Sequence, residues 1–138
     1  MEIKKLNKKD FPKALLEIPQ PPEDLWIIGE LPKPASAGGE NLIYLSVVGS
    51  RKFTSYGKES CEKIIAGLKG YPIAIVSGFA MGIDTIAHKK AMQTGLKTIV
   101  FPGSGLSDEA IYPKTNVRLM REVVENGGCL ISEFEPDF

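Results

Sequence analysis

The chain has 138 residues, of which 43% are hydrophobic and 25% charged, a length that buries one hydrophobic core but not two. Its 17 Lys and Arg residues balance its 17 Asp and Glu residues, so no overall field draws it to nucleic acid or membranes, and any site for a polyanion must be local. No apolar run is long enough to cross a bilayer, and we expect no membrane partner. Cys61 and Cys129 lack the spacing of a metal site, which predicts reduced, buried thiols in a cytoplasmic protein.

The first forty residues differ in character from the rest, and we expect a small N-terminal appendage over 1–40 packed on the core. Residues 11–18 favour a short helix that ends at the prolines of 19–22. Residues 25–29 favour a short strand, followed by a loop rich in Pro, Gly, Ala and Ser. Trp26 is expected to pack against the sheet, because its neighbours are apolar.

The core domain, expected over 41–138, begins with a strand that runs through a glycine turn into a helix. The apolar run 41–48 predicts a buried strand. The following helix is expected over 55–69, with either Thr54 or Ser55 as its N-cap.

The turn between this strand and this helix has the outline of an anion site. Gly49 and Ser50 place free backbone N–H groups near the positive end of the helix dipole, and Arg51 adds a planar fork of donors. Phosphate is the natural ligand of such a turn. For this motif alone the alternative stays open that Gly49 only makes the turn and Arg51 pairs with a surface carboxylate.

A second segment has the same order of a strand, a glycine loop and a helix. The apolar run 73–76 leads into Ser77, Gly78 and Gly82, and the loop opens a helix that ends near Gln93, before a glycine stop signal.

A third strand, over 98–101, leads into Gly103 and Gly105 and then into a longer loop. A helix is expected over 115–125 and a last strand over 129–132. Strands and helices therefore alternate, and the strands are apolar on both faces. This pattern predicts an α/β fold with three layers, a parallel sheet covered by helices on both faces.

The carboxyl ends of the strands should gather the three loops along one edge of the sheet. Gly49, Gly78 and Gly103 each stand at such an end. Open parallel sheets bind ligands in the crevice outside these ends. We therefore expect one ligand site that all three loops share.

Several motifs follow one another at the spacing of a known family. They are 48–51 (VGSR), 77–84 (SGFAMGID) followed by Ala87 and His88, 112–113 (YP) followed by Asn116 and Leu119, and 130–133 (LISE). Together they resemble the DprA/Smf family of bacterial DNA-processing proteins, over about residues 18–138. The resemblance implies an extended Rossmann-like domain that binds single-stranded DNA without sequence preference, protects it and helps to load the RecA recombinase during natural transformation. It implies no catalytic reaction and no cofactor.

The resemblance makes Arg51 and Lys114 the basic residues that hold DNA phosphates, and both follow carboxyl ends of predicted strands. Asn116 is either a phosphate donor or a helix cap, with equal weight. Phe53, Phe79 and Tyr112 lie in the loops, where each either stacks a base or packs. The expected DNA- or phosphate-binding set is Gly49, Ser50, Arg51, Ser77, Gly78, Gly82, Gly103, Gly105, Lys114 and Asn116.

His88 and Asp84 are not expected to carry chemistry. Four residues separate them on one predicted helix, which suits a local side-chain pair. Asp84 is also expected to interact with the positive start of that helix. With no second histidine and no clustered cysteines, we expect no metal site.

The chain departs from the family pattern at two places. The loop 105–112 is about two residues longer than usual, and family members continue beyond a segment like 132–136 into further strands and helices. Self-association and recombinase contact are expected in that further part, so RecA is a doubtful partner here. The sheet is expected to end at the last strand, with an exposed edge open to a second copy as a homodimer.

Other functions remain as alternatives to DNA binding. One is a nucleotide-binding sensor or carrier domain that uses the same phosphate crevice. Another is a lysine-decarboxylase-like phosphoribohydrolase, disfavoured because residues 102–106 lack the Pro-Gly-Gly-x-Gly-Thr pattern of that group. A dinucleotide-dependent dehydrogenase is disfavoured because residues 49–54 lack Gly-x-Gly-x-x-Gly.

Overall fold

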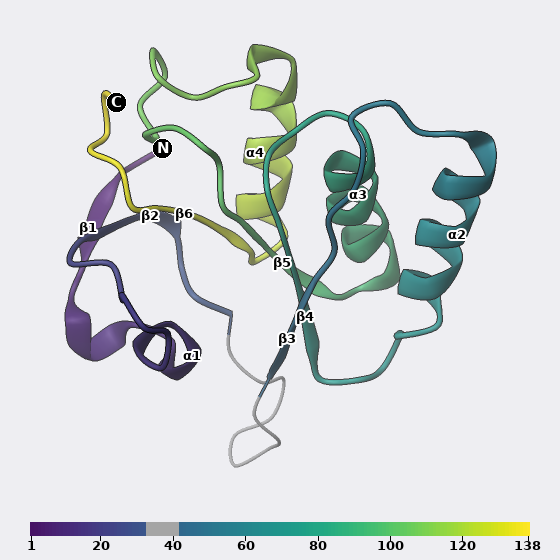
Figure 1. Cartoon of the computed structure of the whole chain (residues 1–138), viewed down its shortest axis with the longest axis horizontal. Helices are drawn as coiled ribbons and strands as arrows, with labels where there is room; N and C mark the ends of the chain where they lie inside the picture. Colours follow the sequence, from purple (N-terminus) through teal and green to yellow (C-terminus); the bar gives the residue numbers. More distant parts are fainter. Residues whose placement is uncertain (33–41) are drawn as a thin grey trace.

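The computed structural model describes residues 1–32 and 42–138. Most of the predicted loop, and Asn41 at the start of the predicted strand, lie outside the described residues. A six-stranded sheet runs through the molecule in the order β1-β2-β6-β5-β4-β3 (Figure 1). The strands are β1 (Lys4–Leu6), β2 (Leu25–Gly29), β3 (Ile43–Ser46), β4 (Ile73–Ser77), β5 (Lys97–Val100) and β6 (Cys129–Ser132). The helices are α1 (Lys13–Leu16), α2 (Ser55–Ala66), α3 (Ile83–Thr94) and α4 (Val117–Glu125), with 3-10 turns at Lys8–Asp10 and Lys114–Asn116.

Four strands, β3 to β6, are parallel, as the alternation of strands and helices predicts. The fold is therefore α/β and Rossmann-like. β2 pairs antiparallel with β6, with Ile27 opposite Ile131, and β1 pairs antiparallel with β2. The first forty residues thus contribute two strands to the same sheet. The prediction that the sheet ends at the last strand is wrong, because β6 lies between β5 and β2.

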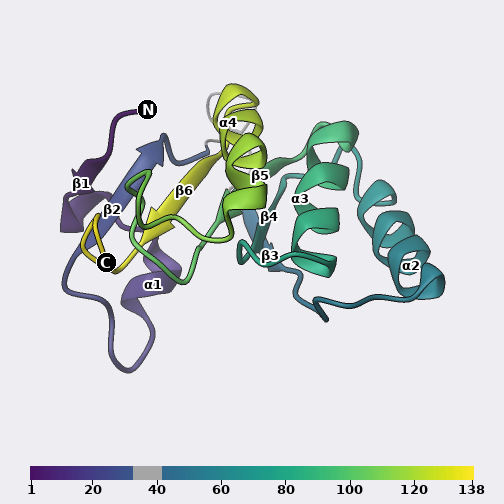
Figure 2. The same cartoon turned by 90° about the horizontal axis from the view of Figure 1, so that it is seen from above.

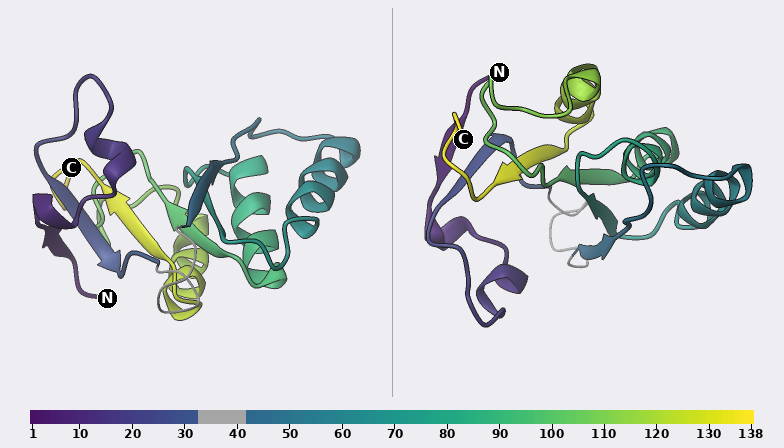
Figure 3. Two further views of the ribbon diagram at one scale, coloured as in Figure 1. Left: turned by 90° about the horizontal axis from the view of Figure 1, so that it is seen from below. Right: turned by 45° about the horizontal axis from the view of Figure 1, so that its top comes forward.

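Helices cover the two faces of the sheet unequally. α2, α3 and α4 lie on one face, and the short α1 lies on the other (Figures 2 and 3). Alternate strand residues serve the two faces: Ile75 and Val100 belong to the clusters under the three long helices. Ile99 and Ile131 belong to the cluster that Phe11 helps to cover. Helices therefore cover both faces, as predicted, but unequally. Three long helices cover one face, and a single turn of helix covers the other.

β3 is an exposed edge strand, which corrects the prediction of a buried one. Ile43 is 60% exposed and Val48 is 73% exposed. β3 pairs only with β4 among the described residues, and α2 packs mainly against α3. The sequence of β3 is that of a buried parallel strand, but no described segment lies against its outer edge.

Local signals set the helix boundaries. The Thr54 side chain accepts a hydrogen bond from the Gly57 N–H at 3.0 Å, so Thr54 and not Ser55 is the N-cap of α2. α3 ends at Gly95, which has a φ of 84°, a left-handed conformation that glycine adopts without strain. α1 is shorter than the helix predicted over 11–18, and α2 ends before the predicted boundary at 69.

The two cysteines and Trp26 are buried, as predicted. Cys61 and Cys129 are free thiols, and burial raises the pKa of Cys129 to about 12. Trp26 is 9% exposed and packs in the core. Among the described residues, no helix has both the length and the apolar character to span a membrane.

Candidate functional site

Three loops meet at the carboxyl ends of β3, β4 and β5. They line a pocket of about 250 Å³ that is open to solvent. Arg51 is the only charged residue that lines this pocket within the described part of the chain. The pocket is lined by Arg51, Phe79, Ala80, Met81, Gly103, Ser104, Tyr112 and Pro113. The shared crevice that the sequence predicts is therefore present.

The first loop places Arg51 at the pocket without a fixed partner. The Ser50 hydroxyl oxygen accepts a hydrogen bond from the Lys52 N–H at 3.2 Å, which shapes the turn. The ion pairs formed by residues 1–32 and 42–138 do not include Arg51. Gly49 packs against Ile83, because a Cβ atom at this position would lie 2.7 Å from that side chain. Gly49 is thus a packing residue beside the pocket, and the guanidinium is available to an anion.

The middle loop is joined to the first loop through its backbone. Gly82 has a φ of 90°, and a Cβ atom there would lie 2.6 Å from the Arg51 carbonyl oxygen. The Ile83 N–H donates to the Ser50 carbonyl at 3.1 Å. Only glycine allows this conformation and this close approach together. The two loops are therefore packed together through their backbones, next to Arg51.

His88 supports the middle loop from inside the protein and corrects the predicted pair with Asp84. Its Nε2 lies 2.7 Å from the Gly78 carbonyl oxygen, and its Nδ1 lies 2.6 Å from Thr98 Oγ1 on β5. A carbonyl only accepts, so Nε2 carries the proton in the neutral imidazole. The single Thr98 hydroxyl proton is then shared between two acceptors, Nδ1 and the Ile75 carbonyl oxygen at 3.1 Å. Burial lowers the pKa of His88, with an opposing contribution from the Gly78 hydrogen bond and from Asp84. His88 is a buried structural residue, because its ring reaches across to β5 rather than along α3.

Ser77 and Gly78 lie below the pocket surface. Ser77 is 3% exposed, and its hydroxyl is the only fully buried side-chain polar atom without a hydrogen-bond partner among the described residues. A Cβ atom at Gly78 would lie 2.7 Å from Asp84 Oδ2. Asp84 stands in the first turn of α3, as predicted. The Ser77 side chain is therefore out of contact with the pocket, and Gly78 makes room for Asp84.

The third loop contains one glycine at the pocket and one away from it. Gly103 lines the pocket, and a Cβ atom there would meet nothing within 4 Å. Gly105 is buried, and a Cβ atom there would collide with the carbonyl oxygens of Glu135 and Pro136. Gly105 belongs to the expected phosphate-binding set, but the backbone of Glu135 and Pro136 occupies the space beside it.

Lys114 and Asn116 have partners that the sequence did not indicate. The Lys114 ammonium donates to the backbone carbonyls of Asp108 and Glu109, the latter at 3.2 Å. The Asn116 side-chain amide donates to the Phe79 carbonyl at 2.9 Å, makes no capping hydrogen bond to α4 and is buried. Asn116 is the N-cap residue of α4 by position. Its side chain does not cap the helix, because its amide donates to Phe79 and Thr85 instead.

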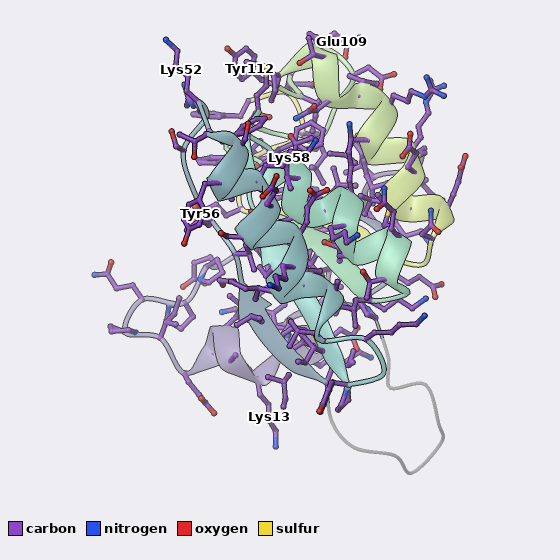
Figure 4. All side chains as sticks on the ribbon, turned by 90° about the vertical axis from the view of Figure 1, so that its right-hand side faces the viewer. Lys13, Lys52, Tyr56, Lys58, Glu109 and Tyr112 are labelled. Atoms are coloured by element: carbon purple, nitrogen blue, oxygen red, sulfur yellow. The ribbon has the colours of Figure 1, made fainter. Side chains whose placement is uncertain are left out.

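The loop aromatics differ in exposure. Phe79 is 3% exposed and belongs to the core, whereas Tyr112 is 68% exposed and lines the pocket. Figure 4 shows Tyr112 and Lys52 at the same end of the molecule. The sequence did not single out Met81 as a pocket residue, although it is 50% exposed there. The signal that could have indicated Met81 is the presence of a large apolar residue inside a glycine-rich loop.

The fold and the pocket define the protein as a Rossmann-like α/β protein with its site at the carboxyl ends of parallel strands. The sequence profile described as DNA recombination-mediator protein A matches residues 2–138. The chain belongs to this family, DprA/Smf. It is 46% identical over 92 residues to DNA processing protein DprA of Streptococcus pneumoniae, which covers 67% of this chain and 31% of that protein. It is 36% identical over 127 residues to Protein Smf of Escherichia coli, covering 92% of this chain and 32% of that protein.

Solved structures agree with this assignment. The DprA crystal structure from Streptococcus pneumoniae matches with a TM-score of 0.77 at 36% identity, over 98% of this chain and 45% of that one. DNA processing protein A from Helicobacter pylori, described for its single-stranded DNA binding mode, matches with a TM-score of 0.79 at 29% identity, over 99% of this chain and 58% of that one. The chain spans about a third of the length of the curated relatives named above.

Proposed function

We propose that the chain binds single-stranded DNA without sequence preference at the pocket between the three loops. The observation that carries this proposal is Arg51: among the residues that the structure describes, it is the only charged group at a pocket otherwise lined by small, apolar and aromatic groups. A guanidinium suits a phosphate oxygen, and the exposed Tyr112 ring suits an unpaired base. Such contacts read the backbone and the π-face of any base, so they carry no sequence information.

The remaining predicted residues have supporting positions in this proposal. Gly49, Ser50 and Gly82 set the backbone around Arg51, and Gly103 lets a strand approach closely. Lys114 needs to exchange its carbonyl partners for a phosphate before it contributes.

We propose no catalytic step and no cofactor for this site. His88 is 0% exposed and fully hydrogen-bonded. Groups of acidic, histidine and cysteine residues suited to a metal ion are not found in the described ranges. The free, buried thiols support action in the reducing cytoplasm. We propose a homodimer for this chain, and we propose no RecA contact for it.

A titration of labelled oligo-dT at two salt concentrations tests the proposal, with dTMP as competitor. We expect oligo-dT to bind and dTMP to compete poorly, since the nucleotide-carrier alternative predicts the reverse. Arg51→Ala should weaken binding and lower the log–log salt slope by about 0.7, the value for one phosphate on a single strand. Arg121→Ala removes an exposed arginine from α4, outside the pocket lining, and is the matched control. Equal binding by both variants would exclude the pocket as the DNA site.

A further inference from the structure

A second groove lies between α2 and α3 and has a volume of about 340 Å³. Three lysines line it: Lys58 on α2, and Lys89 and Lys90 on α3. Glu62 is the only acidic residue in its lining within the described part of the chain. Phe53 also lines the groove and is 47% exposed. The groove therefore combines local positive charge with an accessible aromatic ring.

The three lysines of this groove outnumber its one acidic residue, Glu62, within the described part of the chain. The ion pairs between described residues join Lys5 to Asp24, Lys8 to Glu23 and Arg118 to Glu122. None of the three groove lysines takes part in them. Because the whole chain has a net charge of zero, a surplus of cations in one groove is a local feature of the surface rather than a property of the whole.

The groove adjoins the pocket. The pocket is lined by Arg51 and Met81, and the groove is lined by Phe53 and Gly82, which lie one or two residues further along the same two loops. The Gly82 backbone is packed against the Arg51 carbonyl. The two loops therefore form one ridge with the pocket on one side and the groove on the other. Figure 4 shows Lys58 on α2, below Lys52 and Tyr112.

We propose that a single DNA strand bound in the pocket crosses this ridge and continues along the groove between α2 and α3. Lys58, Lys89 and Lys90 hold its phosphates, and Phe53 stacks one of its bases. This inference rests on the proposed function of the pocket. Cations on two neighbouring helices, together with one aromatic ring, suit an extended polyanion with exposed bases. Lysine ammonium groups act here as point charges, so the groove adds affinity and strand length without adding sequence preference.

Strand length separates the groove from the pocket in an experiment. The probes are oligo-dT of about 6 and about 20 nucleotides, chosen to occupy the pocket alone or both sites. The triple variant Lys58→Gln, Lys89→Gln, Lys90→Gln should bind the short strand like the parent. With the long strand it should bind more weakly, and its log–log salt slope should fall by about 2, for three lost phosphate contacts. The control variant Lys9→Gln, Lys63→Gln, Lys69→Gln removes the same charge from exposed positions outside the groove.

Phe53→Ser provides a second test that leaves the charge unchanged. We expect roughly tenfold weaker binding of the long strand and unchanged binding of the short one, within the range for loss of one stacked base. Arg51→Ala should weaken both lengths, so failure of the pocket is distinguished from failure of the groove. The groove proposal is overturned if the triple variant binds the long strand like the control, if it loses both lengths equally, or if the parent binds neither.

Discussion

Single residues divide into those that shape the loops and those that face the pocket. Gly82 and Gly103 show the difference. Gly82 has a φ of 90° and lies against the Arg51 carbonyl, whereas Gly103 faces open space. Both are glycines in loops after parallel strands, but only the first needs to be glycine for the fold.

We therefore expect Gly82→Ala to lower the free energy of unfolding by ~1–3 kcal/mol, because alanine is strained in this conformation. Gly103→Ala should leave it unchanged within ~0.5 kcal/mol, as for an open surface site. Urea unfolding of the two variants beside the parent measures this difference. Equal midpoints for the two alanine variants would show that the ridge tolerates a side chain at Gly82.

His88 is the only histidine in the chain, so its titration can be isolated. Burial lowers the pKa of His88 in the folded state, and the unfolded chain therefore binds more protons over the range between the folded pKa and about 6.5. The contribution of His88 to stability is then complete above about pH 6.5 and is lost as the pH falls through the folded pKa.

We expect His88→Gln to lower the free energy of unfolding near neutral pH by ~1–3 kcal/mol, because buried hydrogen bonds to Gly78 and Thr98 are disturbed. The variant should also lose less stability than the parent between about pH 7.5 and pH 5.5. Urea unfolding at both pH values gives the two differences. The interpretation of His88 as a buried neutral group is refuted if parent and variant lose equal stability over this range.

Among the secondary-structure elements, β3 differs most from its prediction: its sequence predicts a buried strand, but the strand is exposed. Within residues 1–32 and 42–138, no strand pairs with its outer edge, and Ile43 is 60% exposed. Exposed apolar edge strands are templates for pairing with another chain. A second copy, related by a two-fold axis, can align its own β3 in a closed antiparallel pair.

We expect the chain to form a dimer at high concentration through β3, and Ile43→Lys to keep it monomeric because a charge on an edge strand opposes pairing. Ile64→Lys introduces the same charge on α2, at a residue 63% exposed, and should not change the mass. Light scattering across a concentration series measures both. A monomeric parent, or dimers for both variants, would remove β3 from consideration as an interface.

At the scale of the whole molecule, charge balance limits DNA affinity. The net charge is zero, so no long-range attraction assists binding. The pocket contributes one guanidinium and one exposed ring, Arg51 and Tyr112. Strong binding without sequence preference normally requires several phosphate contacts together with stacked bases.

We therefore expect these 138 residues to bind oligo-dT of about 6 nucleotides, which occupies the pocket alone, with a dissociation constant above about 1 μM at physiological salt. We also expect them to fail to stimulate RecA filament formation on coated single strands. Fluorescence anisotropy and a filament assembly assay give the two results. Submicromolar binding by a strict monomer, together with faster RecA filament formation, would contradict both expectations.

The sequence by itself predicted the kinds of elements in residues 41–138 and a crevice at the carboxyl ends of the parallel strands. Apolar periodicity, the Thr54 cap and the Gly95 stop are local signals, because each depends on residues within one or two turns of chain. Parallel strands then require that Gly49, Gly78 and Gly103 share one edge of the sheet. The position of the pocket, and that of Arg51 beside it, could therefore be predicted from local signals.

Only the tertiary structure decided how distant segments meet. The antiparallel pairing of β2 with β6 and the hydrogen bond from Asn116 to Phe79 join residues far apart in the sequence. The contact of His88 on α3 with Thr98 on β5 and the exposure of β3 also depend on how the elements pack. Strand order and buried hydrogen-bond partners depend on which surfaces pack together, and local periodicity does not encode that choice. The groove between α2 and α3 also depends on tertiary structure, because Lys58 on α2 comes close to Lys89 and Lys90 on α3 only when the two helices pack.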